Sequence, residues 1–153
     1  MNGLVAILNK NPILALSILS WIAAQIFKVA IKGITERTLD LRVLLSSGGM
    51  PSSHSALVCA CATTAGMFHG WSSGLFAVSA VIAAVVMYDA ANVRHAAGEQ
   101  AKLLNYIMEN WNQIRPEFYV RELKELLGHT PVQVFFGGLL GAAVGVWGYY
   151  FLR

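Results

Sequence analysis

Charged residues are scarce in this sequence of 153 residues, because Asp, Glu, Lys and Arg together make up only 12% of it. A soluble domain usually carries about 25% charged residues. Hydrophobic residues make up 56% of the chain, and the mean hydropathy is +0.57. This balance excludes an ordinary water-soluble domain and predicts a protein embedded in a lipid bilayer. The expected crossings and their loops use the whole length, so we expect a single membrane-embedded domain over residues 1–153.

Cysteine is almost absent as well. The two cysteines, Cys59 and Cys61, lie two positions apart in an apolar run, and on a helix they point about 200° apart. They cannot share a metal ion, so we interpret them as small packing residues. The eight acidic residues form no carboxylate cluster that suits magnesium, so we expect no metal and no cofactor. The N-terminal segment lacks a basic region and a small-residue cleavage site, which favours a retained helix over a removed signal.

Long apolar runs dominate what remains. A helix needs roughly 17–25 residues to cross the bilayer core, and four stretches qualify: 12–31, 54–70, 74–92 and 131–152. A tight turn with an interfacial aromatic residue, Trp71, separates the second stretch from the third. We therefore predict an all-α, polytopic membrane bundle with about four transmembrane helices.

The longer polar segment between Arg94 and Thr130 predicts interfacial helices. Residues 96–110 have the apolar spacing of an amphipathic helix that lies on the membrane surface, and residues 117–127 form a second, short one. We therefore expect one or two interfacial helices beside the bundle.

Basic residues are distributed unevenly along the chain, which has a net charge of +3. They lie between apolar segments without the dense clustering typical of nucleic-acid binding, so we expect anionic lipid headgroups as partners and no nucleic acid. With four crossings, the loops before the second and fourth helices lie on the same side of the membrane. Most of the Lys and Arg residues fall on that side, so the positive-inside rule predicts that it is cytoplasmic.

The segment from Leu45 to Ala56 is the most informative in the chain. It reads LSSGGMPSSHSA and places glycines, a proline, hydroxyl residues and His54 where a membrane helix begins. A helix start offers unpaired backbone N–H groups and a positive dipole end, which can bind a phosphate. The alternative interpretation is a serine-capped helix with an incidental histidine.

A second histidine occupies an equivalent place. His129 lies just before the fourth apolar stretch, because Pro131 suits the first turn of a helix. Because two crossings separate the start of the second helix from the start of the fourth, His54 and His129 lie on the same face of the membrane. One neutral imidazole could attack a phosphoryl group while the other protonates the leaving oxygen. The alternative is a pair of unrelated interfacial histidines.

Three blocks of the sequence together resemble a known family. They read GGMPSSHSA, VMYDAANVRHAAGEQAKLLN and ELLGHTPVQVFFGGLLG. In this order they are similar to the YuiD-like divergent branch (acid phosphatase/vanadium-dependent haloperoxidase related) of the type 2 phosphatidic acid phosphatase (PAP2) superfamily. The resemblance to the branch runs from Gln25 to Gly141, whereas only short motifs match the wider superfamily.

The resemblance implies roles for several residues. His129 would be the nucleophile that forms a phosphohistidine, and His54 would be the general acid. Ser52 matches the motif serine, and Ser53 stands where the wider family usually has glycine. The phosphate-binding lysine would be Lys28, or in its place Lys32.

The motif around His129 departs from the pattern of the wider family. That family has an arginine six residues before the nucleophile and an aspartate four after it, and Leu123 and Gln133 stand at those places. Arg94 could supply the arginine if an inserted helix splits the motif, and Arg121 competes for the role. Gln133 can accept a hydrogen bond from the nucleophile but carries no charge. We expect Asp89 to supply the missing carboxylate, because an acid inside an apolar span usually marks a functional pairing; a structural ion pair is the alternative.

Taken together, the resemblance implies a metal-independent hydrolase that acts on a lipid phosphate through a phosphohistidine. A prenyl diphosphate, phosphatidic acid and phosphatidylglycerol phosphate all fit as substrates. The alternative is a catalytically inactive membrane protein that binds or transports anionic lipids. Vanadate-dependent halide oxidation fits so small a membrane chain poorly. The bilayer is the expected partner, and assembly into a homo-oligomer is left open.

Overall fold

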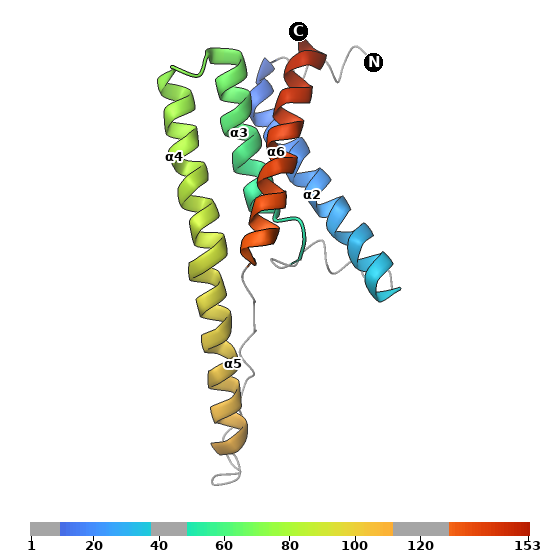
Figure 1. The fold of residues 1–153 in the computed structure, drawn as a ribbon, viewed down its shortest axis with the longest axis vertical. Helices are drawn as coiled ribbons and strands as arrows, with labels where there is room; N and C mark the ends of the chain where they lie inside the picture. The colour runs from blue at the N-terminus through green and yellow to red at the C-terminus, as the bar shows by residue number, and fades with distance from the viewer. Residues whose placement is uncertain (1–9, 38–48, 112–128) are drawn as a thin grey trace.

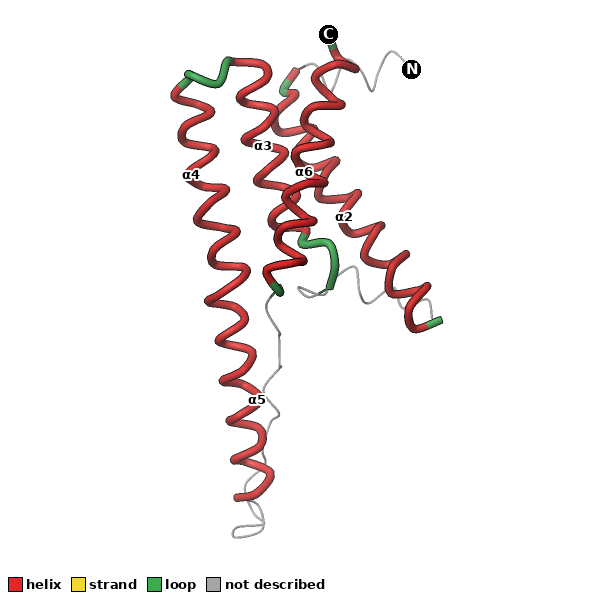
Figure 2. The backbone as a smooth tube through the Cα atoms, viewed as in Figure 1, coloured by secondary structure: helices red, strands yellow, loops and turns green. Residues whose placement is uncertain are grey.

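The computed structural model of the chain describes residues 10–37, 49–111 and 129–153. Nearly all of these residues are helical, and none of them forms a β-strand (Figure 2). The elements in chain order are α2 (Pro12–Glu36), α3 (Ser53–His69), α4 (Gly74–Tyr88), the π-helical segment η2 (Asp89–Val93), α5 (Arg94–Trp111) and α6 (Pro131–Leu152). The predicted all-α membrane bundle is confirmed.

Side-chain caps set where the helices begin. Asn11, Ser52, Ser73 and Thr130 each accept a hydrogen bond from a backbone N–H in the first turn of the following helix. Each cap satisfies a donor that has no partner inside its helix. Proline follows Asn11 and Thr130 directly, in the first turn, where its missing N–H costs nothing. These caps explain why the predicted starts agree so closely with the structure.

Helix α3 lies at the centre of the bundle. Helices α2, α4 and α6 all pack against it, and α2 also packs against α6 (Figure 1). The chain runs along α2, returns along α3, runs forward along α4 and returns along α6. The starts of α3 and α6 therefore lie at one end of the bundle, and the start of α2 lies at the other end.

Close packing between α3 and α6 depends on glycines. A Cβ atom at Gly137 would collide with the carbonyl oxygen of Ser52, and one at Gly141 would collide with the carbonyl oxygen of Ala56. A Cβ atom at Gly145 would lie 3.0 Å from the Cβ atom of Thr63, which is a tight contact with a side chain. Lipid tails are as apolar as leucine, so helices associate in membranes largely through such close contact. The glycines therefore allow α6 to pack closely against α3.

Within the described residues, three helices are long and apolar enough to cross a membrane, namely Pro12–Thr35, Gly74–Met108 and Pro131–Leu152. The remaining predicted crossing is α3, which has 17 residues and so falls at the lower limit of length. It runs alongside the other three, and many of its residues are buried between them. Its central position explains why its sequence is more polar than a lipid-facing helix would be.

The predicted surface helix at 96–110 is present as α5 but its predicted orientation is wrong. Helix α5 continues from α4 through the π-helical segment and extends beyond the bundle, and does not turn to lie across it (Figure 1). No proline interrupts this stretch, and a π segment accommodates an extra residue without ending the helix. The 35 residues of Gly74–Met108 span about 52 Å, which exceeds the bilayer core. The second predicted surface helix, 117–127, lies outside the described residues.

Candidate functional site

The two histidines singled out from the sequence lie side by side at the same end of the bundle. His54 is in the first turn of α3, and His129 comes two residues before the start of α6. Their ring centroids are 5.8 Å apart, and the ring planes are inclined by 65°. The juxtaposition expected from helix parity is therefore observed.

Backbone hydrogen bonds hold three separate segments together around these rings. The N–H of His129 donates to the carbonyl of Ala90 in η2, at 3.1 Å. The N–H of Ser52, just before α3, donates to the carbonyl of Gln133 in the first turn of α6, at 3.0 Å. The site thus forms where α3, η2 and α6 meet. Sequence reasoning missed Ala90, since a backbone carbonyl leaves no signal in the residue type.

Lys28 reaches this end of the bundle from α2. It is only 2% exposed, and its aliphatic stem lies against Gly49. A Cβ atom at Gly49, whose φ is +96°, would lie 3.0 Å from the Cγ atom of Lys28. Glycine is thus needed there both for the backbone conformation and for the close approach of the lysine. The positive charge of Lys28 also helps to lower the pKa of His129, so its ammonium group acts on the site.

One side-chain amide fixes the tautomer of His129. The Oε1 atom of Gln133 accepts a hydrogen bond from the backbone N–H of Thr130 at 3.2 Å, and it also lies 3.2 Å from Nδ1 of His129. A backbone N–H can only donate, so the atom facing it must be the amide oxygen, which can accept a second bond. Nδ1 of His129 therefore carries the proton, and the lone pair of the neutral ring is on Nε2.

The residues that hold the amide of Gln133 in place belong to the N-terminal cap of α6. Thr130 and Gln133 form a capping box at the start of α6, in which the hydroxyl of Thr130 accepts a hydrogen bond from the N–H of Gln133 at 3.3 Å. The cap holds the amide of Gln133 in place beside the histidine. The sequence signal was present as a threonine followed three residues later by glutamine. Gln133 thus makes the contact with the nucleophile candidate that its position in the sequence allows, and a role in substrate binding stays a prediction.

The electrostatic surroundings of His129 favour the neutral ring. Burial lowers the pKa of His129 below its ordinary value of 6.5, and the nearby His54 and Lys28 lower it further. The hydrogen bond with Gln133 opposes this shift, as does the backbone of Gly49 more weakly. Nε2 of His129 is buried, and no group among the described residues meets normal hydrogen-bond geometry at that atom. A neutral imidazole whose Nε2 carries the lone pair is the form that can attack phosphorus.

The predicted phosphate-binding serines are buried at the start of α3. Ser52 caps the helix, and its hydroxyl oxygen also accepts a hydrogen bond from the hydroxyl of Ser55 at 3.1 Å. Ser53 is the first helical residue and is 4% exposed. The capping role that we weighed as the alternative is thus present for Ser52. A role for either serine in phosphate binding stays a prediction.

The other predicted site residues are spread around the same end. Lys32 is half-buried one turn beyond Lys28 on α2. Asp89 is half-buried in η2, next to the alanine whose carbonyl binds His129, and Arg94 is the first residue of α5. The nucleophile-orienting role of Asp89 stays a prediction. Arg121 and Leu123 lie outside the described residues.

The described ranges contain no group of three or more His, Cys, Asp or Glu side chains that could hold a metal ion. His69 is exposed at the far end of α3, away from the two paired histidines. The structure thus brings His54, Lys28 and Gln133 together around His129 at one end of the bundle.

Comparisons with known proteins agree with this description. The model of the Divergent PAP2 family matches residues 9–144. The chain is also 43% identical to the uncharacterized membrane protein YuiD of Bacillus subtilis (strain 168), over 95% of this chain and 99% of that protein. No solved structure matches the chain. With its apolar helices, its paired histidines and a family match over most of its length, the chain is a membrane protein that belongs to the Divergent PAP2 family.

Proposed function

We propose that this protein is a lipid-phosphate phosphatase that hydrolyses a lipid phosphomonoester or diphosphate through a phosphohistidine. The observation that carries the proposal is the pair of imidazole rings 5.8 Å apart, with one ring fixed as the Nδ1–H tautomer. Membership of a PAP2 family supports it. Prenyl diphosphates, phosphatidic acid and phosphatidylglycerol phosphate are the candidate substrates.

In the first step, Nε2 of His129 attacks the phosphorus atom. A nitrogen–phosphorus bond forms as the bond between phosphorus and the leaving oxygen breaks, and protonated His54 donates its proton to that oxygen. The lipid alcohol leaves, or a lipid monophosphate leaves if the substrate is a diphosphate. The phosphoryl group stays on His129.

In the second step, neutral His54 takes a proton from a water molecule as the water attacks the phosphohistidine. The nitrogen–phosphorus bond breaks, inorganic phosphate is released, and both histidines return to their starting protonation states. Positive groups must stabilise the charge on the phosphoryl oxygens during both steps. Lys28 and the positive end of the α3 dipole lie at the site, and we assign this role to them together with Arg94.

The proposal is tested by phosphate release from a panel of lipid phosphates, using purified protein in detergent micelles or vesicles. We expect release that continues in the presence of a metal chelator, falls with vanadate and is lost in His129→Ala. His69→Ala is the matched control, because it changes a histidine at the opposite end of α3 and should keep full activity.

If no lipid in the panel releases phosphate, the proposal that this protein is a phosphatase is contradicted. Retained binding of the same lipids would then favour the alternative function, a membrane protein that binds or transports anionic lipids without hydrolysing them.

A further inference from the structure

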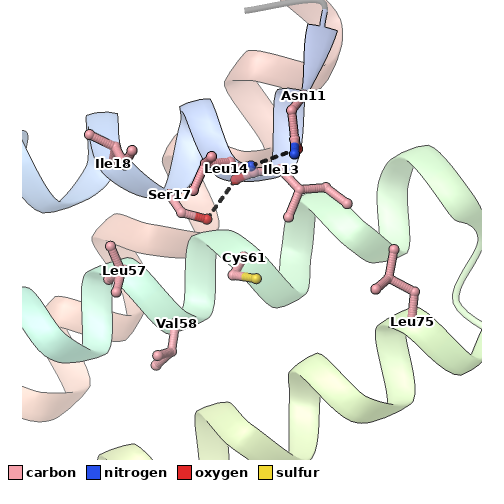
Figure 3. A pocket seen from close by; sticks show the side chains of 9 residues that line it. All are labelled: Asn11, Ile13, Leu14, Ser17, Ile18, Leu57, Val58, Cys61 and Leu75. Atoms are coloured by element: carbon pink, nitrogen blue, oxygen red, sulfur yellow. Dashed lines mark hydrogen bonds between the residues drawn. The ribbon is translucent and has the colours of Figure 1, made fainter.

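An apolar groove of about 460 Å³ runs along α3 between α2 and α4. Figure 3 shows the side chains that line it. Leu14 and Ile18 come from α2, and Leu75 comes from α4. The floor is made by α3, with Leu57, Val58 and Cys61. We call this feature the α3 groove.

The floor of the α3 groove continues the face of α3 that carries His54. Residues 57, 58 and 61 follow His54 at spacings of three, four and seven, which is the repeat of one helix face. On a regular helix these side chains project within about 60° of the direction of His54. Leu57 lies only about one turn, or roughly 5 Å along the axis, from the histidine. The near end of the groove therefore lies about one turn of α3 from the proposed active site.

The other end of the groove lies on the far side of the bundle. Asn11, the cap of α2, and Leu75, in the first turn of α4, line it there. Both walls belong to helices that are apolar enough to cross the membrane. The groove thus runs along membrane-spanning helices, and inside the hydrocarbon core a hydrocarbon chain fills an apolar space whereas water does not.

We propose that the α3 groove holds the hydrocarbon chain of the substrate while its phosphate lies between His54 and His129. The proposal rests on the proposed function and adds that the enzyme recognises a single extended chain next to the phosphate. A phosphate at the cationic site and an apolar tail along α3 match the two parts of one amphipathic molecule. A chain gains little free energy on moving from lipid into the groove, so the groove acts mainly by positioning the phosphoryl group.

The test compares hydrolysis of a long-chain alkyl phosphate with hydrolysis of butyl phosphate, whose chain is too short to reach Cys61. Cys61→Trp and Leu14→Trp fill the groove from its floor and from one wall. Leu139→Trp is the matched control, because Leu139 is half exposed on α6 and does not line the groove.

We expect kcat/KM for the long-chain substrate to fall at least about tenfold in the two groove variants, since misplacing the phosphoryl group slows its transfer. The value for butyl phosphate should change by less than about twofold, as should both values in Leu139→Trp. If one groove variant fails to fold, the kcat/KM values of the other variant test the proposal. Equal effects on the two substrates, or no effect on either, would overturn the proposal.

A wild-type protein that hydrolyses neither substrate would contradict the proposed function, and the groove is then tested by cross-linking. The probe is an alkyl phosphate with a photoreactive diazirine at the end of its chain. Adducts on groove residues that disappear in Cys61→Trp and persist in Leu139→Trp support the proposal. Adducts spread over the lipid-facing sides of α4 and α6, or equal labelling of groove residues in the wild type and in Cys61→Trp, would overturn it.

Discussion

At the residue scale, the amide of Gln133 takes the place of the carboxylate that the wider superfamily has beside its nucleophile. An amide oxygen accepts the hydrogen bond from Nδ1 and so orients the ring, as a carboxylate would. It carries no charge, so it stabilises the protonated ring less. Burial and the neighbouring positive groups therefore keep the pKa of His129 below 6.5. The lowered pKa favours a neutral ring in the proposed nucleophile, His129, in a mildly acidic medium.

A pH profile of kcat/KM tests the role of Gln133 beside Nδ1 of His129. In the wild-type protein the acidic fall in kcat/KM, which reports the free enzyme, should have its midpoint below pH 6.5. Gln133→Glu should move that midpoint to higher pH, because a carboxylate beside Nδ1 favours the protonated ring. Gln133→Leu, which offers no acceptor, should lower kcat/KM by about 10-fold or more without an upward shift. If the acidic fall in kcat/KM has the same midpoint in the wild type and in Gln133→Glu, the contact of residue 133 with Nδ1 of His129 does not control the pKa of the nucleophile, which would contradict the proposal.

Single residues also show where sequence reasoning ends. His54 and His129 could be predicted because proline, serine and glycine mark helix starts and parity then fixes the side of the membrane. The contact between His129 and Ala90 could not, because any residue type can offer a backbone carbonyl. The tautomer of His129 also could not be predicted, since it depends on which atom of Gln133 faces the N–H of Thr130.

At the scale of helices, predicted and observed starts agree within about one residue for α2, α3, α4 and α6 because caps and prolines encode them. The path of α5 was mispredicted for a physical reason. An amphipathic pattern shows which side of a helix is apolar but does not give the angle at which the helix leaves its predecessor. The π-helical segment joins α4 to α5 as one continuous helix, and no turn residue marks it in the sequence.

The junction of α3 and α6 provides a prediction at this scale. Gly137→Ala should destabilise the protein by about 1–3 kcal/mol, because the new methyl group collides with the backbone carbonyl of Ser52. The melting temperature in detergent should fall by several degrees. Gly138→Ala is the matched control, since its methyl group meets the flexible ends of Cys59 and Met87 at 3.3 and 3.5 Å. Equal melting temperatures for the two variants would show that this contact does not hold the helices together.

At the scale of the whole molecule, the low charge and high hydropathy were enough to predict the membrane bundle. The orientation of that bundle is a separate prediction. The basic residues of α2 and α5 lie toward the end that carries the histidines, whereas Lys10 and Arg153 lie toward the opposite end. The positive-inside rule then predicts that the site faces the cytoplasm.

Fusions at the C-terminus test this orientation in a bacterial inner membrane. The end of α6 lies opposite the site, so a reporter fused after Arg153 should face away from the cytoplasm. We expect a fused alkaline phosphatase, which needs an oxidising compartment, to be active and a fused green fluorescent protein to be dark. The reverse result would place the site on the outer face.

The central claim, that His129 accepts the phosphoryl group, is tested most directly by trapping that group during turnover. Substrate labelled with ³²P in the transferred phosphoryl group should label the protein within one turnover. The label should resist base, be lost in acid, map to the peptide that contains His129, and be absent from His129→Ala. Steady hydrolysis of the same substrate with no label on His129, or with label on another residue, would contradict the account.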